Sequence, residues 1–101
     1  MKYYVIGDED TVLGFGMVGV EGRVAEGAAE ADSAFQDAVQ RKDVGIVIVT
    51  ERTAQLIRAR VDPYVLSRRF PLVVEIPDRR GPLPGRPSVR DMVTSAIGIK
   101  I

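Results

Sequence analysis

The sequence predicts an α/β fold: a small open parallel sheet of about four strands with helices on both faces, followed by a C-terminal helix. Two near-continuous apolar runs, at residues 44–50 (VGIVIVT) and 71–77 (PLVVEIP), are typical of strands buried on both faces of a parallel sheet. Segments with helical spacing alternate with the strand-like runs, which favours parallel pairing. With 101 residues the chain has the size of one domain.

The first quarter of the chain predicts a strand, a helix and a short edge strand. Residues 3–7 (YYVIG) are mostly apolar and end at a glycine, as strands often do. A helix should follow within residues 8–20, because acids at its start suit the positive end of the helix dipole and Asp10 or Thr11 can cap it. Residues 22–27 fit an edge strand. Three apolar side chains of the helix lie at helical spacing: Leu13, Met17 and Val20.

Residues 30–42 form the clearest helix in the sequence. Charged side chains occupy one side of it, and Arg41 and Lys42 at its end suit the negative pole of the helix dipole. The strand at residues 44–50 follows directly. The apolar stripe of the helix recurs at the spacing of one helix face and consists of Ala31, Ala34, Phe35, Ala38 and Val39.

A further helical region follows the third strand. Thr50 can cap a helix at residues 51–61, because its side-chain oxygen can accept a hydrogen bond from the first turn. Asp62 and Pro63 should end or kink that helix, since proline has no backbone N–H to donate. A separate helical turn is expected at residues 64–68.

The sequence divides into three parts after these assignments. Residues 1–77 are the expected α/β core, residues 78–87 are a connector rich in Pro, Gly and Arg, and residues 88–101 are the expected C-terminal helix. Ser88 and Asp91 resemble a capping box at the start of that helix. Its apolar stripe consists of Val89, Met92, Val93, Ala96 and Ile97.

The composition excludes several kinds of chemistry. The chain has no cysteine and no histidine, which removes disulfides, thiolate catalysis and the commonest metal ligand and general base. Its formal net charge is zero, so no overall charge attracts nucleic acid or an anionic membrane. No apolar run is long enough to insert in a bilayer, and we expect a cytoplasmic protein. The absence of asparagine hints at a thermophilic source.

The segment GFGMVG (residues 14–19) matches the glycine pattern of dinucleotide-binding sites. That chemistry needs the glycines in the turn directly after a strand, where backbone N–H groups meet the pyrophosphate. Here Gly14 comes seven residues after Gly7, inside the expected helix. We therefore expect no cofactor, and close packing or chance explains the glycines.

The segment GDED (residues 7–10) places acids at the carboxyl end of the first strand, where a phosphoreceiver domain holds Mg²⁺. The predicted fold is receiver/flavodoxin-like, so the comparison is direct. A receiver also needs a phosphorylatable aspartate at the end of its third strand, but Thr50 stands there. Because threonine cannot supply carboxylate chemistry, we expect these acids to cap a helix rather than to bind metal.

A basic cluster lies in and around the connector of this neutral chain. Arg79, Arg80, Arg86 and Arg90 suit bidentate pairing with carboxylates or phosphates, although a solvated loop is the simpler reading. Prolines at 77, 82, 84 and 87 stiffen the segment. The apolar stripe of the final helix can pack on the sheet or on a partner helix, and the pattern alone favours the sheet.

Three segments together resemble the F subunit of the archaeal/vacuolar-type rotary ATPases. They are YYVIGDEDTVLGFGMVGV at the start, PLVVEIPD at residues 71–78 and SVRDMVTSAIGIKI at the end. GDEDTVLGF is quite specific to that family, whereas IP and AIG mean little alone. The segments occur in the family's order and at fitting distances, so the resemblance covers nearly the whole chain.

The resemblance implies a non-catalytic rotor component without cofactors. In that family the F subunit binds the coiled-coil D subunit in the central stalk, contacts a component that links to the membrane ring, turns within the catalytic head and modulates ATP hydrolysis. The C-terminal helix of the family is implicated in contact with the shaft. Carried onto this sequence, the partner-binding residues would be Arg79, Arg80, Arg86, Val89, Arg90, Met92, Val93, Ala96 and Ile97.

Two other classes of protein fit the same sequence pattern. A flavodoxin-like module could bind a nucleotide or another small ligand at the crevice beyond the strand ends. A degenerate receiver could act as an interaction domain without phosphotransfer. An enzyme is the least favoured class, because the sequence contains no acid/base pair or nucleophile constellation.

Overall fold

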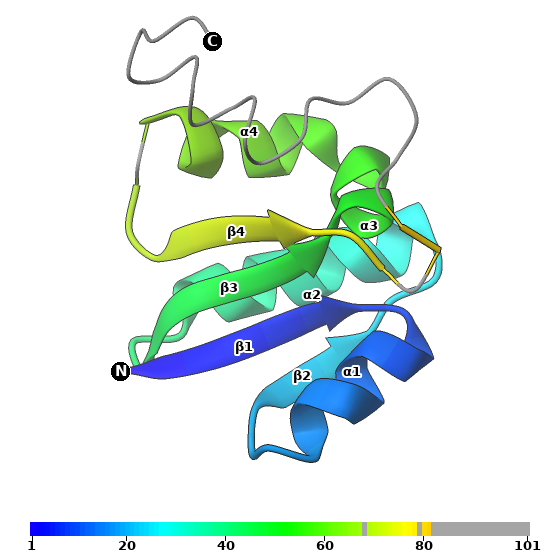
Figure 1. The fold of residues 1–101 in the computed structure, drawn as a ribbon. Coiled ribbons are helices and arrows are strands. Elements are labelled where there is room, and N and C mark those ends of the chain that lie inside the picture. The colour runs from blue at the N-terminus through cyan, green and yellow to red at the C-terminus, as the bar shows by residue number, and fades with distance from the viewer. Residues whose placement is uncertain (68, 79, 82–101) are drawn as a thin grey trace, which may run out of the picture.

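Four parallel strands form one sheet in the order β2-β1-β3-β4 (Figure 1). The computed structural model describes residues 1–67, 69–78 and 80–81. The two central strands, β1 and β3, pair with each other through most of their length. The strands are β1 (Lys2–Gly7), β2 (Glu21–Val24), β3 (Val44–Thr50) and β4 (Leu72–Ile76).

The helices lie on both faces of the sheet, as the sequence predicts. One helix packs on β1 and β2, while the other three pack on the opposite face (Figure 1). This division follows from right-handed crossovers: the chain moves one way from β1 to β2 and then back across β1 to β3 and β4. The helices are α1 (Glu9–Gly16) on the first face and α2 (Ala28–Gln40), α3 (Glu51–Leu56) and α4 (Arg58–Ser67) on the second.

The core fills the space between the sheet and the three helices of the second face. Phe35 of α2 is almost fully buried, and its ring meets Tyr64 of α4 edge to face with centroids 5.5 Å apart. The apolar stripe predicted for α2 is confirmed. Four of its side chains (Ala31, Ala34, Phe35 and Ala38) are buried, and Val39 packs partly buried against the same core.

The first helix differs from its prediction. Asp8, not Asp10 or Thr11, is its N-cap, because the helix begins at Glu9, and the extended Asp8 directly before it has its carboxylate facing the first turn. The helix ends at Gly16, and Gly19 turns the chain with a positive φ of 87°. The apolar spacing predicted for this helix does not produce a buried face, since Leu13 and Met17 are largely exposed.

Two helix ends also differ from prediction. The second helix ends at Gln40, and Arg41 is extended, with its guanidinium on Glu21 and Asp43 at 2.8 Å each. The break in the later helical region falls at Ile57 rather than at Asp62 and Pro63. The following helix tolerates proline because Val61 is buried, Tyr64 and Val65 pack partly buried against the core, and Arg58 reaches Glu75 of β4 at 2.6 Å.

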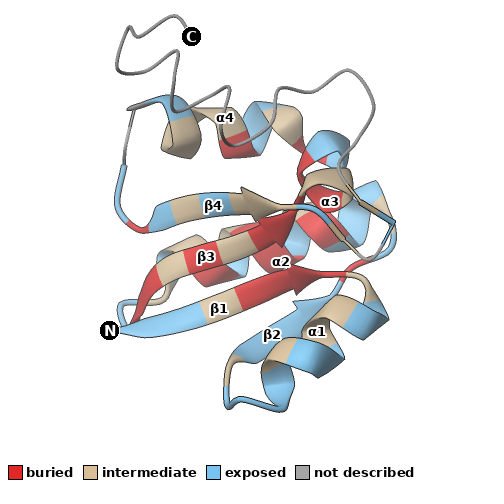
Figure 2. Ribbon diagram, in the orientation of Figure 1, coloured by how far each residue is buried: buried red, intermediate tan, exposed pale blue. Residues whose placement is uncertain are grey.

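The predicted burial of the last two strands is only partly correct. β3 buries Val47 and Val49, but Ile46 and Ile48 on its other face are half-buried. β4 was expected to be buried on both faces, yet none of its five residues is buried (Figure 2). β4 is an edge strand of the sheet. Among the described residues, the helix on this face is α1, and it packs on β1 and β2 near the opposite edge. That apolar face is therefore open next to β4.

The core predicts a large penalty for truncating Phe35. We expect Phe35→Ala to lower the free energy of unfolding by about 3–5 kcal/mol, because it leaves a cavity and removes the ring contact with Tyr64. Urea denaturation followed by circular dichroism measures the change. Leu66→Ala, at a side chain that is 80% exposed, is the control and should change the value by less than about 0.5 kcal/mol. Equal losses in both variants would contradict this core.

Candidate functional site

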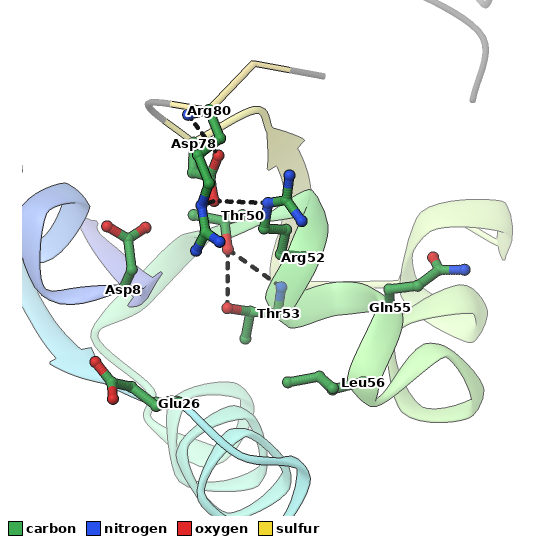
Figure 3. A pocket seen from close by; sticks show the side chains of 10 residues that line it. Asp8, Glu26, Thr50, Arg52, Thr53, Gln55, Leu56, Asp78 and Arg80 are labelled. Carbon is green, nitrogen blue, oxygen red and sulfur yellow. Dashed lines mark hydrogen bonds and ion pairs between the residues drawn. The ribbon is translucent and has the colours of Figure 1, made fainter. Parts of the chain in front are cut away.

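A hollow lies at the carboxyl edge of the sheet, where the chain segments after all four strands meet (Figure 3). Its volume is about 570 Å³. Parallel α/β sheets usually bind ligands at this edge, so the groups around the hollow are the first candidates for chemistry. The polar residues that line it are Asp8, Glu26, Thr50, Arg52, Thr53, Gln55, Asp78 and Arg80.

Asp8 serves the start of α1. Its carboxylate accepts hydrogen bonds from the Thr11 hydroxyl at 2.6 Å and from the Thr11 backbone N–H at 3.2 Å. Partial burial pushes the pKa of Asp8 upward, but these hydrogen bonds outweigh it, and the pKa lies below its ordinary value of 3.8. The carboxylate is therefore a helix cap, as expected for the acids of this segment.

Thr50 also acts as a helix cap, which confirms its prediction. Its hydroxyl oxygen accepts from the backbone N–H of Thr53 at 3.2 Å and donates to the Thr53 hydroxyl at 2.8 Å. Both side chains are buried. The position that a phosphoreceiver gives to its reactive aspartate is thus occupied by a hydroxyl engaged in holding α3 on the end of β3.

Asp78 fixes the chain where it leaves the sheet. Its side chain is only 2% exposed and lies between two guanidinium groups, with Arg52 Nε at 3.1 Å and Arg80 Nε at 3.6 Å (Figure 3). The Arg52 contact is an ion pair that lacks the alignment of a hydrogen bond. The Asp78 carboxylate also accepts from the Arg80 backbone N–H at 2.9 Å, and the Asp78 carbonyl accepts from the Gly81 N–H. We call this set of contacts among Arg52, Asp78, Arg80 and Gly81 the exit clamp.

The glycines of residues 14–19 do not lie in a phosphate-binding turn. Gly14 and Gly16 belong to the second half of α1, and Gly19 lies in the turn after it. A side chain at Gly14 or Gly16 would meet nothing within 4 Å, so close packing does not explain these glycines either. Within the described ranges, no three acidic side chains are grouped so that they could hold a metal ion.

Of the nine predicted partner-binding residues, the structure describes one. Arg80 lies at the exit clamp, where its side chain pairs with Asp78. Sequence reasoning missed Arg52 as the second partner of Asp78, because the two residues are distant in sequence and only the fold joins them. The other predicted residues lie outside the described residues: Arg79, Arg86, Val89, Arg90, Met92, Val93, Ala96 and Ile97.

Comparisons with known proteins identify the family. Residues 4–93 match the family described as ATP synthase (F/14-kDa) subunit. The chain belongs to this family. It is 38% identical to the F subunit of the A-type ATP synthase of Pyrococcus furiosus, over 100% of this chain and 98% of that protein. It is 35% identical to the F subunit of the A-type ATP synthase of Methanothermobacter thermautotrophicus, over 96% of this chain and 92% of that protein.

A solved structure agrees with the fold and the family. The F subunit of the V-type ATP synthase of Archaeoglobus fulgidus aligns with a TM-score of 0.60 and 26% identity. The alignment covers 74% of this chain and 95% of that one. The resemblance found in the sequence is therefore confirmed, and members of the F subunit family are non-catalytic components of the rotary complex. In the described part of the chain, no helix is long and apolar enough to cross a membrane.

The cap at Asp8 predicts a stability difference that depends on pH. We expect Asp8→Ala to cost about 0.5–2 kcal/mol at neutral pH, because the first turn of α1 loses its acceptor. Since the folded pKa of Asp8 is below 3.8, the stabilisation by its charge is present above that pH and is lost as the pH falls through the folded value. Asp8→Asn removes only the charge of this side chain. The difference in free energy of unfolding between wild type and Asp8→Asn should therefore narrow in strong acid.

Unfolding in urea at a series of pH values measures this difference. Glu26→Gln is the matched control, because it removes a carboxylate from the same hollow without removing a helix cap. If the difference in free energy of unfolding between wild type and Asp8→Asn stayed constant down to strong acid, the assignment of Asp8 as a charged helix cap would be wrong.

Proposed function

We propose that this chain is a central-stalk rotor component that binds the coiled-coil D subunit of an A-type ATP synthase. The observation that carries the proposal is the family match over residues 4–93, with relatives aligned over nearly their whole length. In this role the chain couples ATP synthesis or hydrolysis in the catalytic head to ion transport, and it modulates ATPase activity. It also contacts a component that links the stalk to the membrane ring. It is cytoplasmic and peripheral to the membrane.

The described residues support a mechanical role. A part that transmits torque needs a stiff body and a defined point where its contact segment leaves that body. The core is closed by α2, α3 and α4, and the exit clamp joins the end of β4 to α3 through Asp78 and Arg52. The chain beyond Gly81 therefore starts from a fixed point rather than from a loose end.

The contact surface in this proposal is the set of residues predicted from the sequence. The stripe at residues 88–101 supplies apolar contact with helices of the D subunit, because an amphipathic helix binds a partner through residues at helical spacing. Around that contact, acidic side chains of the same partner pair with four arginines of this chain: Arg79, Arg80, Arg86 and Arg90. No small-molecule cofactor takes part.

The apolar stripe yields the first prediction on binding. We expect the double variant Met92→Glu/Val93→Glu to weaken association with the D subunit at least ten-fold, because two buried charges would each lose solvation. Co-expression followed by size exclusion, and titration of the purified partners, measure the loss.

The control places the same two charges elsewhere on the expected helix. Thr94→Glu/Ser95→Glu should leave association within about two-fold of wild type, a difference of roughly 0.4 kcal/mol. If Met92→Glu/Val93→Glu left association unchanged and instead unfolded the isolated chain, the stripe would belong to the core and the proposed contact would be wrong.

The arginines yield a prediction on salt. Arg86→Gln/Arg90→Gln should weaken association with the D subunit in dilute buffer and should matter less at 1 M salt, where the screening length falls to about 3 Å. Arg23→Gln/Arg60→Gln, which removes two arginines whose charges pair within the core domain, is the control. Equal salt dependence in both double variants would contradict a role for the connector arginines.

A further inference from the structure

Residues 8–24 lie at one edge of the fold and contribute no residue to its buried core. They comprise the cap of α1, the helix itself, the turn after it and β2, and none of these residues is buried (Figure 2). The chain on either side is different: β1 buries Val5 and Ile6, and Ala25, which follows β2, is buried as well. The boundary of the core therefore falls at both ends of this segment. We call residues 8–24 the edge unit.

Backbone pairing and one close approach hold β2 on β1. β2 is an edge strand, and its parallel register with β1 runs from Tyr4 opposite Glu21 to Gly7 opposite Val24. In this register Gly22 lies opposite Val5. A Cβ at Gly22 would collide with the Val5 side chain and would come within 2.7 Å of the Val5 carbonyl oxygen. β2 is therefore seated on β1 at a point that only glycine fits.

Two exposed ion-pair sites tie the edge unit to the rest of the chain. Arg41, directly after α2, donates to Glu21 of β2 at 2.8 Å and to Asp43 at 2.8 Å. Arg23 of β2 donates to Asp37 of α2 at 2.9 Å. The hydrogen bonds from Arg41 hold the pKa of Glu21 below its ordinary value of 4.5, so Glu21 is charged at neutral pH. Ion pairs at exposed positions weaken when salt screens them.

The helix of the edge unit has little stability of its own. α1 is eight residues long, and helices this short are marginal in water unless tertiary packing holds them. Gly14 and Gly16 weaken it further, because glycine loses more backbone freedom in a helix than alanine does. α1 packs on β1 and β2. Its stability therefore depends on β2 staying in place, and β2 in turn is covered by α1.

We propose that the edge unit opens and closes as one body while β1, β3, β4 and the helices of the opposite face stay folded. Opening costs less free energy than global unfolding, because the edge unit has no buried residue of its own. The ion pairs of Arg23 and Arg41 set the population of the open form, so ionic strength controls it. Opening uncovers Val5 and the outer edge of β1, whose backbone groups can then pair with another extended strand. This switch does not depend on the proposed function.

Amide hydrogen exchange in the full-length chain tests the proposal. Amides of α1 and β2 should exchange about a hundred-fold or more faster than those of β3, and they should share one dependence on urea because they open together. A central parallel strand donates to its two neighbours from alternate residues, so only the β1 amides that face β2 should exchange with the edge unit. The amides of Val47 and Val49 in β3 report global unfolding.

A matched pair of substitutions tests whether α1 and β2 open together. Gly14→Ala places a methyl group in open space, and it should slow exchange in β2 as well as in α1 by about two- to five-fold, because alanine stabilises the helix. Val65→Ala, in α4, should speed exchange in β3 and leave the edge unit unchanged, since α4 stays folded when the edge unit opens. Unchanged β2 amides in Gly14→Ala would overturn the proposal, because α1 would then fray alone.

The ionic control has a test of its own. Transfer from dilute buffer to 1 M NaCl should speed exchange of the edge unit about three-fold or more, because both ion-pair sites are exposed. Arg23→Gln/Arg41→Gln should exchange fast in dilute buffer and lose this response. Arg60→Gln, which removes an exposed pair on the opposite face, should keep it. Exchange of the wild-type edge unit that ignores salt, or that is no faster than exchange of β3, would overturn the proposal.

Discussion

The strand order is the constraint on which the rest of the structure depends. β1 and β3 occupy the centre, and the right-handed crossovers put only α1 on one face and three helices on the other, within the residues that the structure describes. The apolar residues of β3 point to both faces, so half of them are buried by α2 and its neighbours. The other half face a side that α1 alone is too short to cover. This imbalance leaves an apolar surface for a further element.

The carboxyl edge of the sheet, where related folds perform chemistry, is used here for structure. Asp8 and Thr50 cap helices, and Asp78 holds Arg52 and Arg80 at the point where the chain leaves the sheet. Each of these polar groups stabilises a junction between a strand and the segment after it. The chain belongs to a family of non-catalytic components of the rotary complex, and the groups at this edge hold the fold together.

Sequence patterns predicted the parts of the fold that depend on local periodicity. The stripe around Phe35 and the cap at Thr50 are confirmed, since each follows from residues within a few turns of one helix. The choice between Asp8 and Asp10 as a cap depended on how soon the helix begins after the first strand, and α1 begins at Glu9, directly after Asp8. The exposure of Val74 could not be predicted from its apolar run, because burial depends on which layer covers an outer strand. The ion pair between Arg52 and Asp78 was likewise set by the tertiary fold.

The central claim is that α2, α3 and α4 bury one face of the sheet, while the apolar face beside β4 is left exposed by the residues that the structure describes. Accessibility of methyl groups to a dissolved paramagnetic agent tests the claim in a chain that ends at residue 81. We predict that the Val47 methyls are protected and that the Val74 methyls are accessible. Equal accessibility of the two sets of methyls would contradict it.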